Sequence, residues 1–196
     1  VMRGLADHDG RVIIGGGVRP ENIIMTDSKG ILHPDRADAE NLKANYKEKW
    51  HFATTTNADR KTGSAAEAMK DADAVIALSL PGSMKAEWIK DMAEDPIVFV
   101  CSNPQPEIWP WEAEEAGARI IATGRSDFPN QVNNSLGFPG IFRGTLDLRA
   151  KTITDDMCIA ADRAMAEIAE KNGLHEEYII PTMDDWEVFP YEAAKV

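Results

Sequence analysis

Cysteines, basic residues and long apolar runs are all scarce in this sequence. Its 196 residues include two cysteines, Cys101 and Cys158, which argues against a disulfide framework. No apolar run is long enough to span a bilayer, and no charged and then apolar leader is visible, so we expect neither a membrane span nor a secretory signal. The sequence therefore predicts a cytoplasmic protein without a membrane partner.

Acidic residues dominate the charge. Lys and Arg total 21 against 33 Asp and Glu, so the formal net charge is −12. A nucleic-acid backbone would be repelled, and no basic cluster offsets this, so we expect no nucleic-acid partner. The histidines are scattered with no two at metal-ligand spacing, so the sequence predicts no metal site in this chain. They are His8, His33, His51 and His175.

Short apolar runs alternate with helical patterns along the first two thirds of the chain. The runs are nearly all apolar, which is typical of central strands in a parallel sheet covered on both faces. They occupy residues 11–14, 22–26, 74–79, 97–102 and 119–123. The helical patterns occupy residues 37–50, 64–70, 85–93 and 110–116. This order predicts an α/β fold with a doubly wound, mostly parallel, Rossmann-like sheet.

The last quarter of the sequence has a different pattern. Thr154 is a suitable N-cap, and two acidic residues follow it in the first turn, where the helix dipole favours them. Apolar residues then recur at helical spacing up to Asn172, and Gly173 supplies a stop. The sequence predicts one long C-terminal helix, followed by an acidic tail that contains aromatic residues.

Carboxamides, glycines and prolines crowd residues 123–143, which directly follow an apolar run. Asn130, Gln131, Asn133 and Asn134 each offer a hydrogen-bond donor and an acceptor. The glycines and prolines fix the backbone and allow another group to approach closely. We interpret the segment as a binding loop, and an asparagine-rich turn is the alternative.

Five segments, in order along the chain, resemble malic enzymes, particularly the short bacterial and archaeal kind. They are NIIMTDSKG at 22–30, SNPQPE at 102–107, GRSDFPNQVNN followed by FPGIFRG from 124, RAKTIT at 149–154 and PTMDDWEVFP at 181–190. The resemblance covers the chain from about Val18 to its C-terminus. It implies the cofactor-binding part of an NAD- or NADP-dependent enzyme that oxidatively decarboxylates malate to pyruvate and CO2. It further implies Mg2+ or Mn2+ as a cofactor and a homo-oligomeric parent protein, a dimer.

The chain is divided accordingly into two parts. Residues 1–150 are expected to form the dinucleotide-binding, Rossmann-like domain. Residues 151–196 are expected to form a C-terminal helix and tail that pack on this domain or on a partner subunit. A rival hypothesis is a non-catalytic regulatory or assembly module that kept the fold and lost its phosphate loop.

Ligands of a doubly wound sheet bind at the carboxyl ends of its strands. Asp27 ends the second apolar run and could accept hydrogen bonds from the ribose hydroxyls of NAD, although a simple turn Asp would look the same. Ser28 and Lys29 adjoin it, and Lys29 could bind the 2′-phosphate of NADP instead. Ser79 and Gly82 follow the third run, where the glycine would let the backbone approach the cofactor.

The resemblance assigns roles to three asparagines. It implies that Asn103 contacts the cofactor or the substrate and that Asn134 contacts the substrate. Asn133 is expected to support the cofactor site. Arg125 and Asp127 lie in the same segment, and we expect them to form a structural ion pair.

The chain departs from the family in two respects. The apolar runs at 11–14 and 22–26 are separated by too few residues for a crossover helix, so the glycines at 15–17 are no dinucleotide fingerprint. Either the phosphate loop is deleted or the sequence omits part of the polypeptide, and the loop after Ser79 is also shortened. The family's catalytic Tyr and Lys and its metal ligands have no counterpart, so we expect no catalytic residue here and no activity of the chain alone.

Overall fold

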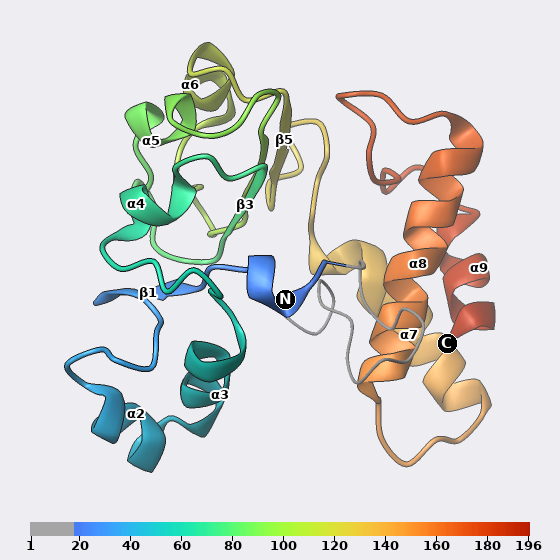
Figure 1. Ribbon diagram of the computed structural model, residues 1–196. Helices are drawn as coiled ribbons and strands as arrows, with labels where there is room; N and C mark the ends of the chain where they lie inside the picture. The colour runs from blue at the N-terminus through green and yellow to red at the C-terminus, as the bar shows by residue number, and fades with distance from the viewer. Residues whose placement is uncertain (1–17) are drawn as a thin grey trace. The chain divides into compact units, whose positions relative to one another are not determined.

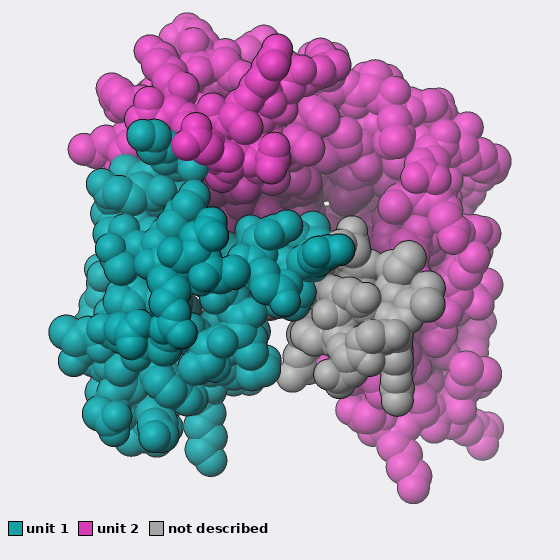
Figure 2. Space-filling view, in the orientation of Figure 1, with its two compact units in different colours: residues 1–70 teal, residues 71–196 magenta. Residues whose placement is uncertain are grey.

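The computed structural model describes residues 18–196 (Figure 1). The predicted strand at 11–14 and the glycines at 15–17 lie outside the described residues. The chain divides into two compact units, of which the first ends at Lys70 and the second begins at Asp71 (Figure 2). The domain boundary predicted at residue 150 falls within the second unit and stays a prediction.

The first unit contains a short hairpin and small helices. Its described elements are η1 (Pro20–Asn22), β1 (Thr26–Asp27), β2 (Gly30–Ile31), α2 (Ala39–Asn45), α3 (Lys47–Thr55) and α4 (Ala65–Met69). Its core consists of Leu32, Leu42 and Ala53, against which partly buried Met25, Trp50 and Phe52 pack. The single helix expected at 37–50 is interrupted at Tyr46, whose φ of −135° is not helical.

The predicted parallel strand at 22–26 is wrong in the described part of the chain. Only its last residue, Thr26, is in a strand, and β1 pairs with β2 antiparallel, with Thr26 opposite Ile31. Ser28 and Lys29 are the only residues between the two strands. A two-residue connection can join antiparallel strands but not parallel ones, so the turn determines the pairing.

The second unit contains the parallel sheet. Its strands are β3 (Ala74–Ala77), β4 (Ile97–Val100) and β5 (Ile120–Thr123), in the order β3-β4-β5. All three are parallel, and α5 (Ala86–Lys90) and α6 (Pro110–Glu115) lie between them in sequence. Val98, Val100 and Ala122 are completely buried. The predicted α/β class is confirmed, and so are the last three predicted strands, within two residues at their ends.

Three helices, α7 (Asn134–Asp147), α8 (Asp155–Asn172) and α9 (Val188–Lys195), pack on one another at the C-terminus (Figure 1). The prediction of α8 is confirmed, with Thr154 as N-cap and Gly173 after its last residue. The prediction of a loop through residue 143 is wrong, because α7 begins at Asn134 and continues through Pro139. Packing against α9 outweighs the poor helix propensity of its glycines and proline. No helix among residues 18–196 is long and apolar enough to cross a membrane.

Two glycines make this packing possible. A Cβ on Gly144 would lie 2.6 Å from the carbonyl oxygen of Ala193, and a Cβ on Gly140 would overlap the carboxylate of Glu192. Both glycines are buried. A Cβ on Gly137 would make only ordinary contacts, none closer than 3.5 Å. The closest approach of α7 to α9 therefore depends on Gly140 and Gly144.

Gly144→Ala should destabilise the chain by about 1–3 kcal/mol, because the new methyl group meets a backbone oxygen that cannot move away alone. Gly137→Ala is the matched control, and it should be neutral or stabilising by up to about 1 kcal/mol because alanine favours the helix. Urea unfolding of both variants measures the difference. A Gly144→Ala variant that is as stable as the Gly137→Ala variant would show that α7 does not need a glycine at position 144.

Glu192 is a buried carboxyl group between α7 and α9. It is completely inaccessible, and neither carboxyl oxygen has a hydrogen-bond partner among residues 18–196. Burial raises the pKa of Glu192 to about 7, and the negative charge of Asp162 on α8 adds to the shift. In an unfolded chain the same group ionises near pH 4.3, at about the ordinary pKa of glutamate. Ionisation of Glu192 therefore opposes folding.

Stability should fall as the pH rises from about 4.5 to 7, because the folded state binds the Glu192 proton more tightly than the unfolded state does. Glu192→Gln removes this titration, so the variant should lose about 1–3 kcal/mol less than the wild type between pH 5 and pH 8. Unfolding free energies at both pH values measure this loss. Parallel pH profiles for the two proteins would contradict the assignment.

Candidate functional site

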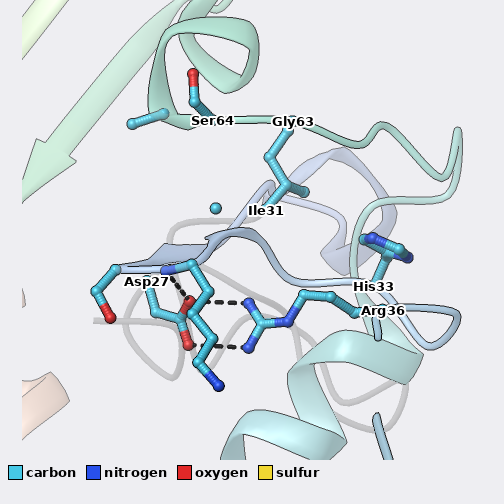
Figure 3. Close-up of a pocket in the computed structure, with 10 residues that line it drawn as sticks. Asp27, Ile31, His33, Arg36, Gly63 and Ser64 are labelled. Atoms are coloured by element: carbon cyan, nitrogen blue, oxygen red, sulfur yellow. Dashed lines mark hydrogen bonds and ion pairs between the residues drawn. The ribbon is translucent and has the colours of Figure 1, made fainter. Parts of the chain in front are cut away.

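The predicted site residues fall into two groups, one in each unit. Asp27, Ser28 and Lys29 lie together at the hairpin of the first unit, where Ser28 and Lys29 form the turn. They line a pocket of about 500 Å³, whose far wall includes Gly63 and Ser64 (Figure 3). Ser79, Gly82, Asn103, Asn133 and Asn134 belong to the second unit.

Gly30 allows the two walls of the Asp27 pocket to lie close together. Gly30 has a φ of 105°, and a Cβ on it would overlap the carbonyl oxygen of Gly63. The next residue, Ile31, donates its backbone N–H to the same oxygen at 2.8 Å. A residue with a side chain at position 30 would be strained and would push the 63–64 segment away.

Asp27 is held by four donors. Its Oδ1 accepts from the backbone N–H of Lys29 at 2.9 Å and from Nη1 of Arg36 at 2.8 Å. Its Oδ2 accepts from Nη2 of Arg36 at 3.2 Å and from Nζ of Lys49 at 2.8 Å (Figure 3 shows the Arg36 bonds). Burial alone would raise the pKa of Asp27, but the bonds from Arg36, Lys49 and the Lys29 backbone hold it well below its ordinary value. Asp27 is therefore ionised throughout the physiological pH range.

A second carboxylate completes this ion-pair network. Asp38 accepts from Arg36 Nε at 2.6 Å and from Lys29 Nζ at 2.8 Å, and the hydrogen bonds from Arg36 and Lys29 lower the pKa of Asp38 to about 2. Three cations thus face two carboxylates. The Arg36 side chain is 9% exposed, whereas those of Lys29 and Lys49 are 61% and 44% exposed. The two lysines are the cations that can turn towards an anionic ligand.

In the second unit, the predicted residues lie at the carboxyl ends of the parallel strands. Ser79 and Gly82 follow β3, and Asn103 follows β4. The backbone N–H of Gly82 donates to the carbonyl oxygen of Pro106 at 3.1 Å, which joins the two loops. Gly82 has a φ of 69° with open space around it, so its backbone conformation favours glycine here.

Glu107 has no sequence-predicted role, yet it is completely buried between these loops. Its carboxylate accepts from the backbone N–H groups of Ser79 at 2.7 Å and Ser102 at 3.0 Å. Burial raises the pKa of the nearby Cys101 thiol to about 11, and the charge of Glu107 contributes. Cys101 therefore stays protonated at neutral pH and is no nucleophile.

The asparagines of the 123–143 segment have different roles. Asn130 is buried and donates to the carbonyl oxygens of Ile121 and Glu176, while its Oδ1 accepts from the Ile179 N–H. Asn133 caps α7, accepting from the Ser135 N–H at 2.9 Å and donating to the Gly124 carbonyl oxygen at 2.9 Å.

Asn134 and Asn103 differ from these structural asparagines. Both are exposed, and within residues 18–196 neither carboxamide makes a hydrogen bond. The expected ion pair of Arg125 and Asp127 is present, at 2.7 Å. Arg125 also donates to the carbonyl oxygen of Pro104, next to Asn103, at 2.8 Å. The edge of the sheet where β3, β4 and β5 end therefore presents two exposed carboxamides. Arg125 holds the backbone next to Asn103, and Asn133 holds the backbone next to Asn134.

Sequence reasoning missed Arg36, Lys49 and Glu107. Arg36 and Lys49 lie nine and 22 residues after Asp27, and no spacing rule links them to it. Glu107 lies in the quoted SNPQPE segment, and its one available signal is an acidic residue among prolines and the apolar Ile108. That signal is weak, because a setting poor in hydrogen-bond donors disfavours burial of a carboxylate unless other segments supply the donors.

Known proteins match this chain closely. The family model "Malic enzyme, NAD binding domain" matches residues 18–195. The bifunctional malic/malolactic enzyme of Bacillus subtilis strain 168 is 47% identical over 180 residues, which are 92% of this chain and 42% of the relative. The NADP-dependent malic enzyme of Halomonas elongata is 43% identical over 190 residues, covering 89% of this chain and 43% of the relative.

Solved structures agree. A crystal structure of malic enzyme from Entamoeba histolytica has a TM-score of 0.84 and 57% identity, covering 90% of this chain and 36% of that one. An NAD-dependent malic enzyme from Thermotoga maritima has a TM-score of 0.80 and 40% identity, with coverages of 90% and 45%. The chain spans less than half the length of these relatives. It belongs to the malic enzyme family, in which it corresponds to the NAD-binding domain.

Proposed function

We propose that this chain supplies the dinucleotide site and two substrate contacts of an enzyme that oxidatively decarboxylates malate to pyruvate and CO2, reducing NAD or NADP. The observation that carries the proposal is the pair of exposed carboxamides, Asn103 and Asn134, which make no hydrogen bond within the described part of the chain. A carboxamide NH2 can donate to a carboxylate oxygen of malate without bringing a charge. The alternative of a non-catalytic module is not favoured, because the family match extends over nearly the whole chain.

The Asp27 pocket suits the adenosine ribose. All four acceptor positions of the Asp27 carboxylate are used, so a ribose hydroxyl must replace one donor. The Lys49 amine is the replaceable one, since its side chain is 44% exposed and makes a single hydrogen bond to Asp27, whereas the Arg36 side chain is only 9% exposed and bonds through two nitrogens. A displaced Lys49 would also lie near a 2′-phosphate, as Lys29 would, so a pocket in which a neutral residue replaces Asp27 should accommodate NADP better.

The remaining chemistry belongs to the rest of the enzyme. When bound at this site, NAD or NADP would supply the hydride acceptor for the oxidation of malate. Among residues 18–196 no group of three His, Cys, Asp or Glu side chains could hold a metal ion. The family resemblance is what favours ligands of Mg2+ or Mn2+ in another domain of the enzyme. The same holds for the general acid and base, and the chain alone should be inactive.

The proposal includes a homodimeric, cytoplasmic enzyme. Phe138, Phe142 and Leu146 recur every four residues on α7 and are 46%, 50% and 72% exposed, as on a surface that another chain or domain covers. Cys101 and Cys158 are free thiols, which fits a reducing compartment.

In the whole enzyme, Asn134→Ala should lower kcat/KM for malate about 10- to 1000-fold, because losing hydrogen bonds to a charged group costs about 1.5–4 kcal/mol. The dissociation constant of the dinucleotide should change little. Asn41→Ala, an exposed asparagine on α2, is the matched control and should leave both values unchanged. If the dinucleotide constant rises in step with the loss of rate, Asn134 binds cofactor instead of malate.

Asp27 should favour NAD, since its charge accepts from ribose hydroxyls and repels a 2′-phosphate. Asp27→Ser should therefore lower the ratio of kcat/KM for NAD to that for NADP at least about tenfold. Asp35→Ser removes an aspartate that is 73% exposed and, within residues 18–196, pairs only with Arg60, and it should leave the ratio unchanged. A ratio that does not move in Asp27→Ser would remove Asp27 from the cofactor site.

A further inference from the structure

One carboxylate continues the strand ladder beyond the ends of β3 and β4. The last paired residues of these strands are Ala77 and Val100, which lie opposite each other. Ser79 and Ser102 are each two residues further on, and both donate their backbone N–H to Glu107, at 2.7 Å and 3.0 Å. Glu107 thus links the loop after β3 to the loop after β4, two residues beyond the last strand pairing.

The backbone around Glu107 strengthens the same connection. The Met84 N–H donates to the Glu107 carbonyl oxygen at 3.0 Å, and the Gly82 N–H donates to the Pro106 carbonyl oxygen at 3.1 Å. The loop after β3 is therefore held at three points, residues 79, 82 and 84, by two successive residues of the loop after β4. Of these contacts, only the one to Ser79 depends on a side chain.

A buried carboxylate is costly unless donors compensate for the lost water, and here two backbone N–H groups do so. Both donors are needed, because each carboxyl oxygen bonds to a different loop. The carboxylate therefore fixes the separation of the two loops. A neutral amide in its place would present an NH2 group to one of the backbone N–H groups and would force that loop away.

We propose that Glu107 is a positioning residue, which holds the 79–82 loop and the Ser102–Asn103 segment at the separation that binds the dinucleotide. This inference rests on the proposed function, which assigns Ser79, Gly82 and Asn103 to the cofactor site. Glu107 contacts neither cofactor nor substrate in this role. It acts through the backbone of the two loops.

Dinucleotide binding by the whole enzyme tests the inference. Glu107→Gln should raise the dissociation constant of the preferred dinucleotide, NAD or NADP, at least tenfold, and should increase hydrogen exchange at the Ser79 and Ser102 amides. Glu112→Gln is the matched control, since Glu112 accepts one backbone N–H, from Trp109, at an exposed helix start. Gly144→Ala controls for lost stability alone. Both controls should bind within twofold of the wild type.

A Glu107→Gln variant that is folded and binds within twofold of the wild type would overturn the inference, whatever its stability. So would a Gly144→Ala variant that loses affinity to the same extent. If Glu107→Gln does not fold, Glu107→Asp keeps the charge but is too short to reach both loops, and the same criterion applies to it. A wild-type enzyme that binds neither dinucleotide would instead refute the proposed function, so the two failures are distinct.

Discussion

The parallel register of β3, β4 and β5 is the constraint on which the strand-end site depends. Ala77, Val100 and Thr123 lie on one rung of the ladder, so all three strands end at the same level. The segments that follow must therefore leave the sheet along one edge. Residues that are some 25 residues apart in sequence are neighbours there, and this proximity comes from backbone pairing before any side chain contributes.

The sequence predicted the elements whose signal is local. Fully apolar runs identified β3 to β5, and Thr154 and Gly173 marked the ends of α8. The failures occurred where a distant contact outweighed the local signal. Glycines and a proline in α7 favour a loop, but the groove they leave receives α9, and that packing lies some 50 residues away in the sequence.

Candidate site residues could be selected from the sequence to the extent that ligands bind where apolar runs end, and their role stays a prediction. Asp27 and Asn103 could be selected because each follows an apolar run. Their partners could not, because Arg36 reaches Asp27 only through the fold of the first unit, and Glu107 reaches Ser79 only across the sheet edge. Only the family resemblance separated Asn133 from Asn134. The residue pattern itself could not show that the Asn133 carboxamide bonds to backbone groups, whereas that of Asn134 makes no hydrogen bond among residues 18–196.

The cap of α7 also restricts how this part of the molecule can move. One end of the Asn133 carboxamide binds Gly124 at the end of β5, and the other binds Ser135 in the first turn of α7. The bond to Ser135 moves with the helix, so rotating α7 against the sheet would break the bond to Gly124. As long as that bond holds, Asn134 at the start of α7 moves together with the end of β5, so the position of this carboxamide is tied to the sheet.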